Sequence, residues 1–253
     1  MSASSVDPAN AATSSRPALV VAVHGTRSDA GQAVAHGLAE AVADRLPGIE
    51  VHVGWADVLS PTLTETLAGL DEAVVVPCFL TAGYHVTSDL PAAVDAAGGR
   101  ARLTGMIGPA LLAAVADRLA EAGDPADAVV LAAAGSKRRR SVAEVAAAAR
   151  ALSAVIGRPV VPAYLTAAEP GVGDAVAALR AAGHARVAVA SYLLAPGVFA
   201  DRLHEAGADV VSAPIGVHPL VVEAVLSAYA SLGSAELDLP DALSTAPGVE
   251  RIA

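Results

Sequence analysis

Two histidines each follow an apolar run that is typical of a buried strand. His24 comes directly after the run 18–23, and His85 follows the run 73–76 after a turn that contains a glycine. Side chains just past the carboxyl ends of strands in an open α/β sheet line its functional crevice. Neutral imidazole binds Fe(II), Co(II), Ni(II) and Zn(II), and it can instead accept a proton. Both histidines are therefore candidates for metal binding and proton transfer, although each could equally cap a strand end by hydrogen bonding to the backbone.

The segments that would position these histidines alternate between strands and helices. We expect Ser28 or Asp29 to cap the first helix, and Ser60-Pro61 to open the second. This alternation predicts an α/β fold with a parallel sheet and helices on both faces. In the first half of the chain we expect strands over 18–23, 50–56, 73–76 and 101–107, and helices over 28–46, 60–70, 85–97 and 108–122.

The same pattern recurs in the second half of the chain. The turn 193–197 resembles the turn 79–83, and the expected strands there are 128–134, 159–164, 185–192 and 208–215. The matches lie roughly 110 residues apart, which is too long a period for a solenoid and suits a duplicated domain. We therefore predict two duplicated lobes, each a parallel sheet flanked by helices. The expected parts are a disordered leader over 1–17, a first lobe over 18–124, a second lobe over 125–233 and a tail over 234–253.

The duplication also reveals an asymmetry between the two halves. His24 aligns with Ala134, and His85 aligns with about Val198, so both histidines belong to the first half alone. Each copy of a duplicated fold needs its own core, so packing positions tend to persist in both. Residues present in one copy only are better candidates for a function, which favours a chemical role for the pair.

Composition and charge exclude several classes of protein. A net charge of −10 argues against a general nucleic-acid binder, which needs a basic face. The apolar runs are interrupted before the ~18 residues that a membrane-spanning helix needs, so we expect neither nucleic acid nor membrane as a partner. One cysteine excludes a disulfide or a Cys-based cluster within the chain. The amino terminus lacks the basic and apolar regions of a signal peptide, so we expect a cytoplasmic location.

Two stretches resemble motifs of the class II chelatases, and in particular of the sirohydrochlorin chelatases of the CbiX/SirB type. These stretches are 21–27 (VAVHGTR) and 77–86 (PCFLTAGYHV), with 89–91 (DLP) shortly after, and each of the first two contains one of the histidines. The resemblance covers about residues 18–232, including the internal duplication. It implies two similar α/β lobes with an active-site cleft between them.

The resemblance also implies an activity: insertion of a divalent metal into sirohydrochlorin, with Fe(II) for sirohaem or Co(II) in the cobalamin pathway. His24 and His85 match the family's two active-site histidines, which are thought to bind the metal and assist removal of the pyrrole protons. The metal is a substrate here, and no permanently bound cofactor is expected. Short relatives pair as homodimers, whereas this chain carries both lobes, so we expect a monomer.

Alternatives to a ferrochelatase stay open at this point. Imidazole accepts iron and cobalt alike, and we favour Fe(II) because the tail lacks the histidines of some cobalt-type relatives. A cobaltochelatase is the alternative enzyme, and a non-catalytic carrier of metal or tetrapyrrole would use the same residues. A phosphate-handling enzyme is disfavoured because the chain has no glycine-rich phosphate loop.

An acidic protein needs local cations to hold a substrate with many carboxylates. Arg27 lies beside His24, and Lys137 and Arg138 begin a basic run at the start of a helix in the second lobe; guanidinium groups bind carboxylates in a bidentate fashion. Gly83 would permit close approach of the substrate, and Tyr84 could stack on the macrocycle. The plain alternatives are solvated charges for the basic run, a tight turn for Gly83 and a lid over the core for Tyr84.

The remaining residues of interest are expected to be structural. Cys78 ends an apolar run and is interpreted as a small core residue. Trp55 ends the second strand and either lines the cleft or packs against its neighbours. The other histidines lack paired spacing and are expected to be surface or packing residues; they are His36, His52, His184, His204 and His218.

Overall fold

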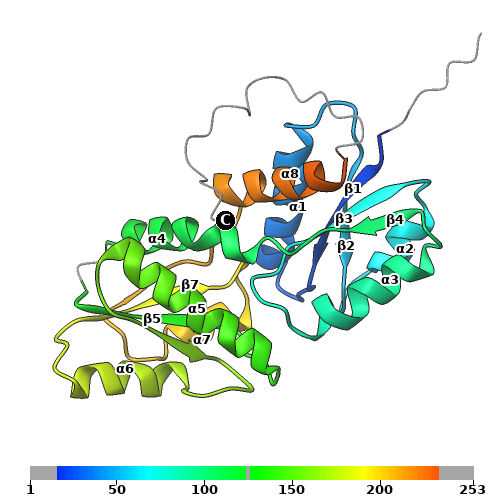
Figure 1. The fold of residues 1–253 in the computed structure, drawn as a ribbon. Coiled ribbons are helices and arrows are strands. Elements are labelled where there is room, and N and C mark those ends of the chain that lie inside the picture. The colour runs from blue at the N-terminus through cyan, green and yellow to red at the C-terminus, as the bar shows by residue number, and fades with distance from the viewer. Residues whose placement is uncertain (1–15, 124–125, 234–253) are drawn as a thin grey trace, which may run out of the picture.

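The computed structural model describes residues 16–123 and 126–233, which form two four-stranded parallel sheets (Figure 1). The strand order is β2-β1-β3-β4 in the first sheet and β6-β5-β7-β8 in the second. The predicted duplicated α/β fold is confirmed, while most of the predicted leader and the whole tail lie outside the described residues. The strands are β1 (Ala18–Val23), β2 (Val51–Trp55), β3 (Ala73–Pro77), β4 (Ala101–Leu103), β5 (Ala128–Ala133), β6 (Val160–Tyr164), β7 (Val187–Tyr192) and β8 (Val210–Val211).

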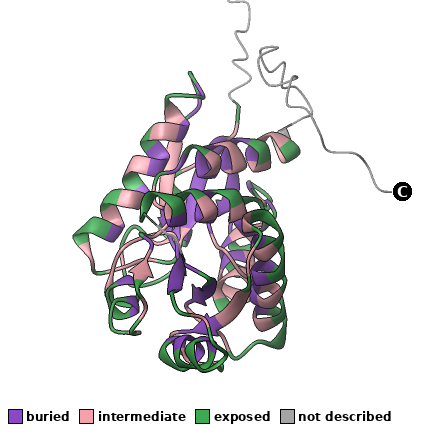
Figure 2. Ribbon diagram, turned by 90° about the vertical axis from the view of Figure 1, so that its left-hand side faces the viewer, coloured by how far each residue is buried: buried purple, intermediate pink, exposed green. Residues whose placement is uncertain are grey.

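Helices cover both faces of the two sheets. Figure 2 shows the buried strands in purple, enclosed by helices with exposed outer faces. None of the described helices is long and apolar enough to span a membrane. The helices are α1 (Asp29–Ala43), α2 (Leu63–Ala68), α3 (Leu90–Ala96), α4 (Leu112–Glu121), α5 (Arg139–Ile156), α6 (Val172–Ala181), α7 (Val198–Leu203) and α8 (Pro219–Gly233), with a π-helical turn η1 (His85–Asp89) before α3 and a 3-10 turn η2 (Gly108–Leu111) before α4.

The last helix of each sequence repeat packs on the sheet of the other repeat. Helix α4 closes the first repeat but contacts α5 and β7, whereas α8 closes the second repeat and contacts α1 and β3 (Figure 1). Buried side chains from both repeats consequently join one core, which includes Leu19 and Val129. Smaller apolar clusters cover the opposite face of each sheet. This exchange makes the two lobes one packed unit.

The central strands of each sheet are buried and consist almost wholly of apolar residues, with Ser191 of β7 as a buried polar exception. Strands β1, β3, β5 and β7 each lie between two neighbours and are covered on both faces, as is usual for parallel sheets. Continuous Val, Ala and Leu runs suit such a position, whereas alternation of polar and apolar residues would leave polar groups buried. In open α/β sheets, ligands bind at the carboxyl ends of such strands.

Helix α2 does not begin where the sequence predicted. It begins at Leu63 rather than at Ser60-Pro61, with Thr62 as the capping residue. The Thr62 hydroxyl accepts a hydrogen bond from the Glu65 amide, and the Glu65 carboxylate accepts one from the Thr62 amide. This capping box satisfies two amides that the helix itself cannot pair, which explains why the start moves past the proline.

Two edge strands are shorter than predicted. Strand β4 ends at Leu103 rather than 107, and β8 covers only 210–211 rather than 208–215. Beyond Leu103 the chain still runs beside β3. The segment after Leu103 has one more residue than the part of β3 that it faces, which interrupts the regular ladder as in a β-bulge. The remaining contacts run from the amides of Thr104 and Ile107 to the carbonyls of Val75 and Pro77.

The strand registers refine the alignment of the two lobes. Ala73 and Val187 are equivalent, because each pairs with the first residue of its central strand, β1 or β5. Counting forward from them, the residue equivalent to His85 is Phe199 rather than the predicted Val198. The correction is a single residue, and the second lobe still has no histidine at this place.

Candidate active site at the edge of the first sheet

The carboxyl ends of β1 and β3 bring His24 and His85 together. These strands are neighbours in the first sheet, so the loops that follow them leave the same edge side by side. The centroids of the two imidazole rings lie 4.4 Å apart, with an angle of 79° between the ring planes. The two predicted histidines thus share one site, and their individual roles stay predictions.

Asp89 orients the ring of His85. The Oδ2 atom of Asp89 lies 2.7 Å from Nδ1 of His85, because residues four apart share one face of a helical turn. An ionised carboxylate only accepts hydrogen bonds, so the ring hydrogen is assigned to Nδ1 and the lone pair to Nε2. The Nε2 atom of His85 is therefore the one that can meet a metal ion or a proton.

The π-helical turn that carries this pair has a cause in the sequence. Pro91 has no amide hydrogen, and in a regular α-helix its ring would clash with the carbonyl of residue 87. In the structure the amide of Leu90 donates to the carbonyl of His85, five residues earlier. Such π-turns are frequent at functional sites, and this one places His85 at the first position of its helix.

His24 is exposed and follows the end of β1 directly, with Nδ1 3.2 Å from the carbonyl oxygen of Gly25. Gly25 has φ +103°, and a Cβ there would lie 2.0 Å from the carbonyl oxygen of Asp57. Its counterpart Gly135 has φ +96°, and a Cβ there would lie 1.8 Å from the carbonyl oxygen of Thr166. Both lobes therefore need this glycine turn, whereas only the first lobe carries the histidine.

Phe79 borders both imidazoles, and sequence reasoning assigned it no role. Its ring centroid lies 6.5 Å from that of His24 and 6.5 Å from that of His85. Asp89 was likewise given no role, although its spacing of four residues from His85 was a signal for the contact. Phe79 supplies an apolar surface beside the two polar rings, which suits the face of a flat organic ligand.

The second lobe contacts this site through Arg138. The guanidinium carbon of Arg138 lies 5.5 Å from the centroid of the Tyr84 ring, a cation–π contact. One guanidinium nitrogen donates to the hydroxyl of Ser88 at 3.4 Å. The Tyr84 side chain is exposed and stands edge-on to His85, with 6.1 Å between ring centroids. Two of the predicted substrate-binding residues, Tyr84 and Arg138, thus meet beside the histidines.

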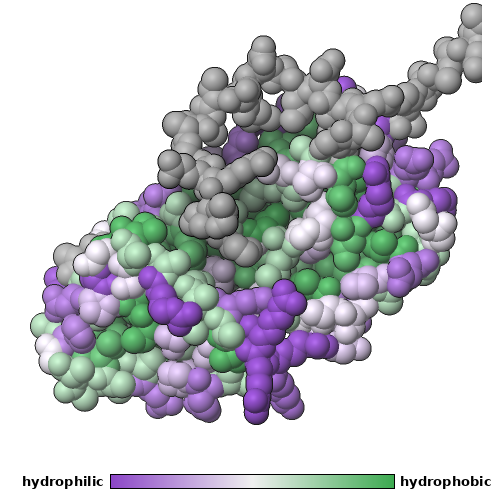
Figure 3. Space-filling model, viewed as in Figure 1, coloured by the Kyte–Doolittle hydropathy of each residue, from purple (hydrophilic) through white to green (hydrophobic). Residues whose placement is uncertain are grey.

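The other predicted cations point to solvent. Arg27 and Lys137 are exposed, and neither forms a hydrogen bond or ion pair within residues 16–123 and 126–233. The basic run 137–140 lies at the amino-terminal end of α5, where Figure 3 shows a strongly hydrophilic cluster in the lower middle of the molecule. Arg140 in this run pairs with Glu144 at 3.0 Å. The part that Arg27 and Lys137 play in binding stays a prediction.

Gly83 is not a glycine that the backbone requires. Its φ lies outside the left-handed region, and a Cβ there would meet nothing within 4 Å. The Gly83 amide nevertheless donates to the carbonyl of Thr81 at 2.9 Å, so the interpretation as a plain tight turn stays open. The open space above Gly83, next to Tyr84 and His85, agrees with the alternative, in which a ligand approaches the chain closely at this point.

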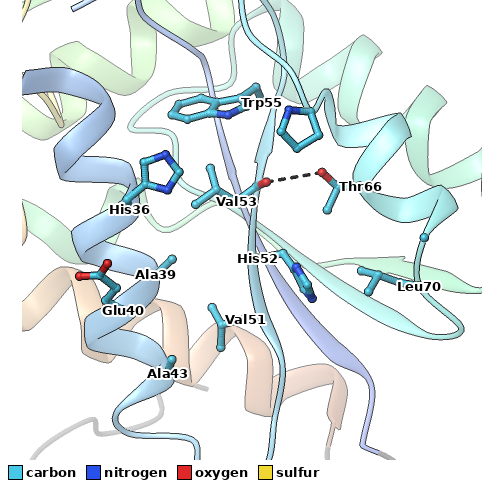
Figure 4. Close-up of a pocket in the computed structure, with 12 residues that line it drawn as sticks. His36, Ala39, Glu40, Ala43, Val51, His52, Val53, Trp55, Thr66 and Leu70 are labelled. Atoms are coloured by element: carbon cyan, nitrogen blue, oxygen red, sulfur yellow. Dashed lines mark hydrogen bonds between the residues drawn. The ribbon is translucent and has the colours of Figure 1, made fainter. Parts of the chain in front are cut away.

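Trp55 lines a different cavity. A space of about 520 Å³ lies beside edge strand β2, between α1 and α2, and its lining contains neither His24 nor His85 (Figure 4). The Trp55 side chain is buried and its ring stands edge-on to that of His36, with 5.8 Å between centroids. Trp55 is thus a packing residue that borders this groove rather than the histidine pair.

Cys78 is buried, as the sequence predicted, and burial raises the pKa of its thiol to about 12. It therefore stays protonated and is a core residue beneath the site. No group of three or more His, Cys, Asp or Glu side chains that could hold a metal ion occurs within the described residues. The histidine pair would thus give a visiting metal ion two protein ligands and leave its other positions open.

A family model described as CbiX matches residues 18–122 and 128–232. The two matched segments follow the two sequence repeats and together cover most of the chain. Among curated proteins, the sirohydrochlorin cobaltochelatase of Methanococcoides burtonii is 32% identical over 73 residues, which are 27% of this chain and 56% of that protein. The protein of the same name from Methanopyrus kandleri is 34% identical over 79 residues, 29% of this chain and 55% of that protein. The chain spans about half the length of these relatives.

Solved structures share the architecture of both lobes. SirB from Bacillus subtilis, solved with Fe3+, superposes with a TM-score of 0.73 at 22% identity, covering 87% of this chain and 98% of that one. A CbiX described as the terminal enzyme of sirohaem biosynthesis in denitrifying bacteria has a TM-score of 0.62 at 24% identity, covering 84% and 99%. These likenesses confirm the fold. With the family match over both repeats, the chain belongs to the CbiX family of class II chelatases.

Proposed function

We propose that this chain is a sirohydrochlorin chelatase, which inserts Fe(II) or, alternatively, Co(II) into the macrocycle. The observation that carries the proposal is the pair of facing imidazoles, 4.4 Å apart, at the functional edge of a parallel sheet. Membership in the CbiX family and the names of the curated relatives support this choice of substrate.

The site can supply the two chemical needs of metal insertion. The metal must be delivered to one face of the macrocycle, and two N–H protons must be removed. His85 offers Nε2 for either task, since Asp89 engages Nδ1. His24 is exposed and lies close enough to share a metal ion with His85 or to take a proton in its place. We infer that one imidazole holds the incoming ion while the other accepts protons.

Cations and aromatic rings around the pair suit the substrate. Sirohydrochlorin carries many carboxylates, and Arg138, Lys137 and Arg27 would offset their charge in an otherwise acidic protein. Phe79 and Tyr84 would contact the macrocycle face.

Two metal ions are candidates for insertion. We keep Fe(II) as the preferred ion, and the names of the curated cobaltochelatases favour Co(II) as the second candidate. Related folds have been solved both with Fe3+ and with cobalt. A competition between the two ions under anaerobic conditions, followed by the distinct absorbance of the two products, is expected to give a higher kcat/KM for Fe(II). A higher value for Co(II) assigns the chain to the cobalt branch.

Turnover tests the proposed function. Anaerobic absorbance spectra of sirohydrochlorin with Fe(II) or Co(II) are expected to show insertion well above the uncatalysed rate. The product should exceed one equivalent of protein, which separates an enzyme from a carrier of metal or tetrapyrrole. Insertion at the uncatalysed rate would contradict the proposal, and binding without turnover would assign the carrier function.

Removal of the Asp89 carboxylate is expected to slow insertion by about 10- to 100-fold, the usual range for a residue that orients a metal-binding histidine. Asp89→Ala leaves Nδ1 of His85 without an acceptor, so the ring can rotate and exchange tautomers. Asp89→Asn keeps an acceptor oxygen and should lose less. Measurement of kcat, together with the 15N shifts of the His85 ring, checks this; a ring that keeps its tautomer in Asp89→Ala would contradict it.

Arg138→Ala is expected to raise the KM for sirohydrochlorin by about tenfold, because it removes a guanidinium that can bind a substrate carboxylate and that covers Tyr84. The KM for the metal should stay the same. Arg150→Ala, an exposed arginine of the same helix α5, is the matched control. An equal effect of both substitutions would show that only the overall charge matters.

A further inference from the structure

The loop that leads to His85 is held by the histidine-free lobe. We name residues 80–84 the histidine loop. Three side chains of the second lobe hydrogen-bond to this loop, two of them from α5 and one from the end of β7. The Glu144 carboxylate accepts from the Ala82 amide at 2.7 Å, the Ser141 hydroxyl donates to that of Thr81 at 3.0 Å, and the Tyr192 hydroxyl donates to the Leu80 carbonyl at 3.3 Å.

The internal duplication provides a comparison for these three side chains. Helices α1 and α5 begin at equivalent places after Ser28 and Arg138, and the strand registers align β3 with β7. The equivalent residues of the first lobe lack the hydroxyl and carboxylate groups that form these bonds. They are Gly31 for Ser141, Val34 for Glu144 and Cys78 for Tyr192.

The loop of the second lobe that is equivalent to the histidine loop also lacks the groups needed for these bonds. Pro196 replaces Ala82 and has no amide hydrogen, and Ala195 replaces Thr81 and has no hydroxyl. The short thiol of Cys78, which directly follows β3, contacts the carbonyl of Val76 in that strand. The turn 193–197 therefore receives none of the three bonds that hold the histidine loop. A requirement of the shared fold would apply in both directions, whereas these bonds occur only where the loop leads to a histidine.

The chemistry of the three groups suits a permanent contact. Burial, and then the nearby Glu144 carboxylate, raise the pKa of Tyr192 to about 12, so its hydroxyl remains a donor at neutral pH. Each carboxylate oxygen of Glu144 has its own partner: Oε1 pairs with the Arg140 guanidinium, and Oε2 accepts a hydrogen bond from the Ala82 amide. Ser141 is buried and touches the loop directly.

We propose that Ser141, Glu144 and Tyr192 are positioning residues, through which the second lobe holds the histidine loop and keeps His85 beside His24. None of them reaches the imidazoles, so they act through the loop backbone. This role explains what the histidine-free lobe contributes to a site whose histidines both come from the first lobe. Its kinetic consequences rest on the proposed function, whereas its structural consequences do not.

Substitutions at Glu144 test the proposal kinetically in the full chain. Glu144→Ala removes the acceptor of the Ala82 amide and is expected to lower kcat for Co(II) insertion by about tenfold, with the KM for sirohydrochlorin changed less than about twofold. Glu144→Gln keeps an acceptor oxygen and should restore most of the rate. The matched control is Ser153→Ala, which removes a hydrogen bond from the same helix to the carbonyl of Arg158 at 2.7 Å, away from the loop.

Amide hydrogen exchange tests the same contact without any turnover. The Ala82 amide should exchange at least about tenfold faster in Glu144→Ala than in the unsubstituted protein, and the 15N resonances of the His85 ring should shift or broaden. Tyr192→Phe should produce a smaller change in the same loop. Circular dichroism spectra and melting temperatures identify variants that have lost the fold, and Tyr192→Phe, which removes one oxygen, serves if Glu144→Ala does not fold.

The outcomes separate this proposal from the proposed function. Unchanged exchange at Ala82 together with unchanged His85 resonances in Glu144→Ala would overturn the positioning role, even if the protein is an active chelatase. If the unsubstituted protein does insert metal, equal kcat values for Glu144→Ala and Ser153→Ala would overturn it as well. Faster exchange and altered His85 resonances in a protein that shows no insertion would support the positioning role and refute the chelatase activity alone.

Discussion

Replacing His24 and His85 together with alanine is expected to lower the rate of metal insertion by about 10³-fold or more, to near the uncatalysed rate. The two rings are the groups in the site that can ligate a metal ion and accept a proton, and general acid–base catalysis alone typically contributes 10²- to 10⁴-fold. Neither side chain is part of the apolar core, so the double variant should keep its fold and its melting temperature.

The single substitutions should differ from each other. His85→Ala removes the ring that Asp89 orients, whereas His24→Ala removes an exposed ring whose hydrogen-bond partner among the described residues is the carbonyl of Gly25. We expect the double variant to lose less than the product of the two single losses, because residues that act as a unit are not additive. Initial rates with Co(II) under anaerobic conditions measure this, with His204→Ala, an exposed histidine outside the site, as the control. Rates that survive in the double variant would remove the histidines from the mechanism.

Gly25→Ala and Gly135→Ala are each expected to destabilise the protein by about 3 kcal/mol or more, since both backbone strain and a steric clash are introduced. Both glycines have φ near +100°, and an added Cβ would lie 2.0 Å and 1.8 Å, respectively, from a backbone carbonyl oxygen. Backbone atoms cannot give way as the end of a flexible side chain could. Urea unfolding followed by circular dichroism measures the loss.

The two glycine variants should separate stability from activity. Gly25 adjoins His24, so Gly25→Ala should lower the activity of the folded fraction at low temperature, whereas Gly135→Ala should lower stability alone. Gly105→Ala is the control for both, because a Cβ there meets nothing within 4 Å and its φ lies outside the left-handed region. Full stability in Gly25→Ala would show that the turn after β1 can adopt another conformation.

Comparison of equivalent positions in the two lobes separates residues that the shared fold requires from residues that belong to the histidine site. The glycine turn is present in both lobes, at Gly25 and Gly135. In each lobe the turn after the first strand passes so close to a backbone carbonyl, that of Asp57 or of Thr166, that a Cβ would clash with it. The histidines, their orienting carboxylate and the contacts to the histidine loop are present once. Within the described residues the duplicated frame thus carries one histidine pair, and the second lobe contacts its surroundings through Arg138, at Tyr84, and through Glu144, at the histidine loop.

The amino-acid sequence by itself determined the alternation of strands and helices, the duplication and the two histidines at strand ends. These features depend on neighbouring residues: apolar runs, caps and turns act over a few positions. Local chemistry also explains where this reasoning was wrong, since the capping box at Thr62 outweighed the proline signal at Ser60-Pro61.

The tertiary structure decided which of these residues meet. The strand order β2-β1-β3-β4 places β1 beside β3 and so joins His24 to His85. The exchange of α4 and α8, the contact of Arg138 with Tyr84 and that of Glu144 with Ala82 join residues far apart in the chain. Such contacts depend on how the two sheets pack around one shared core, because a residue's distant neighbours are set by the burial of the whole apolar surface rather than by any local pattern.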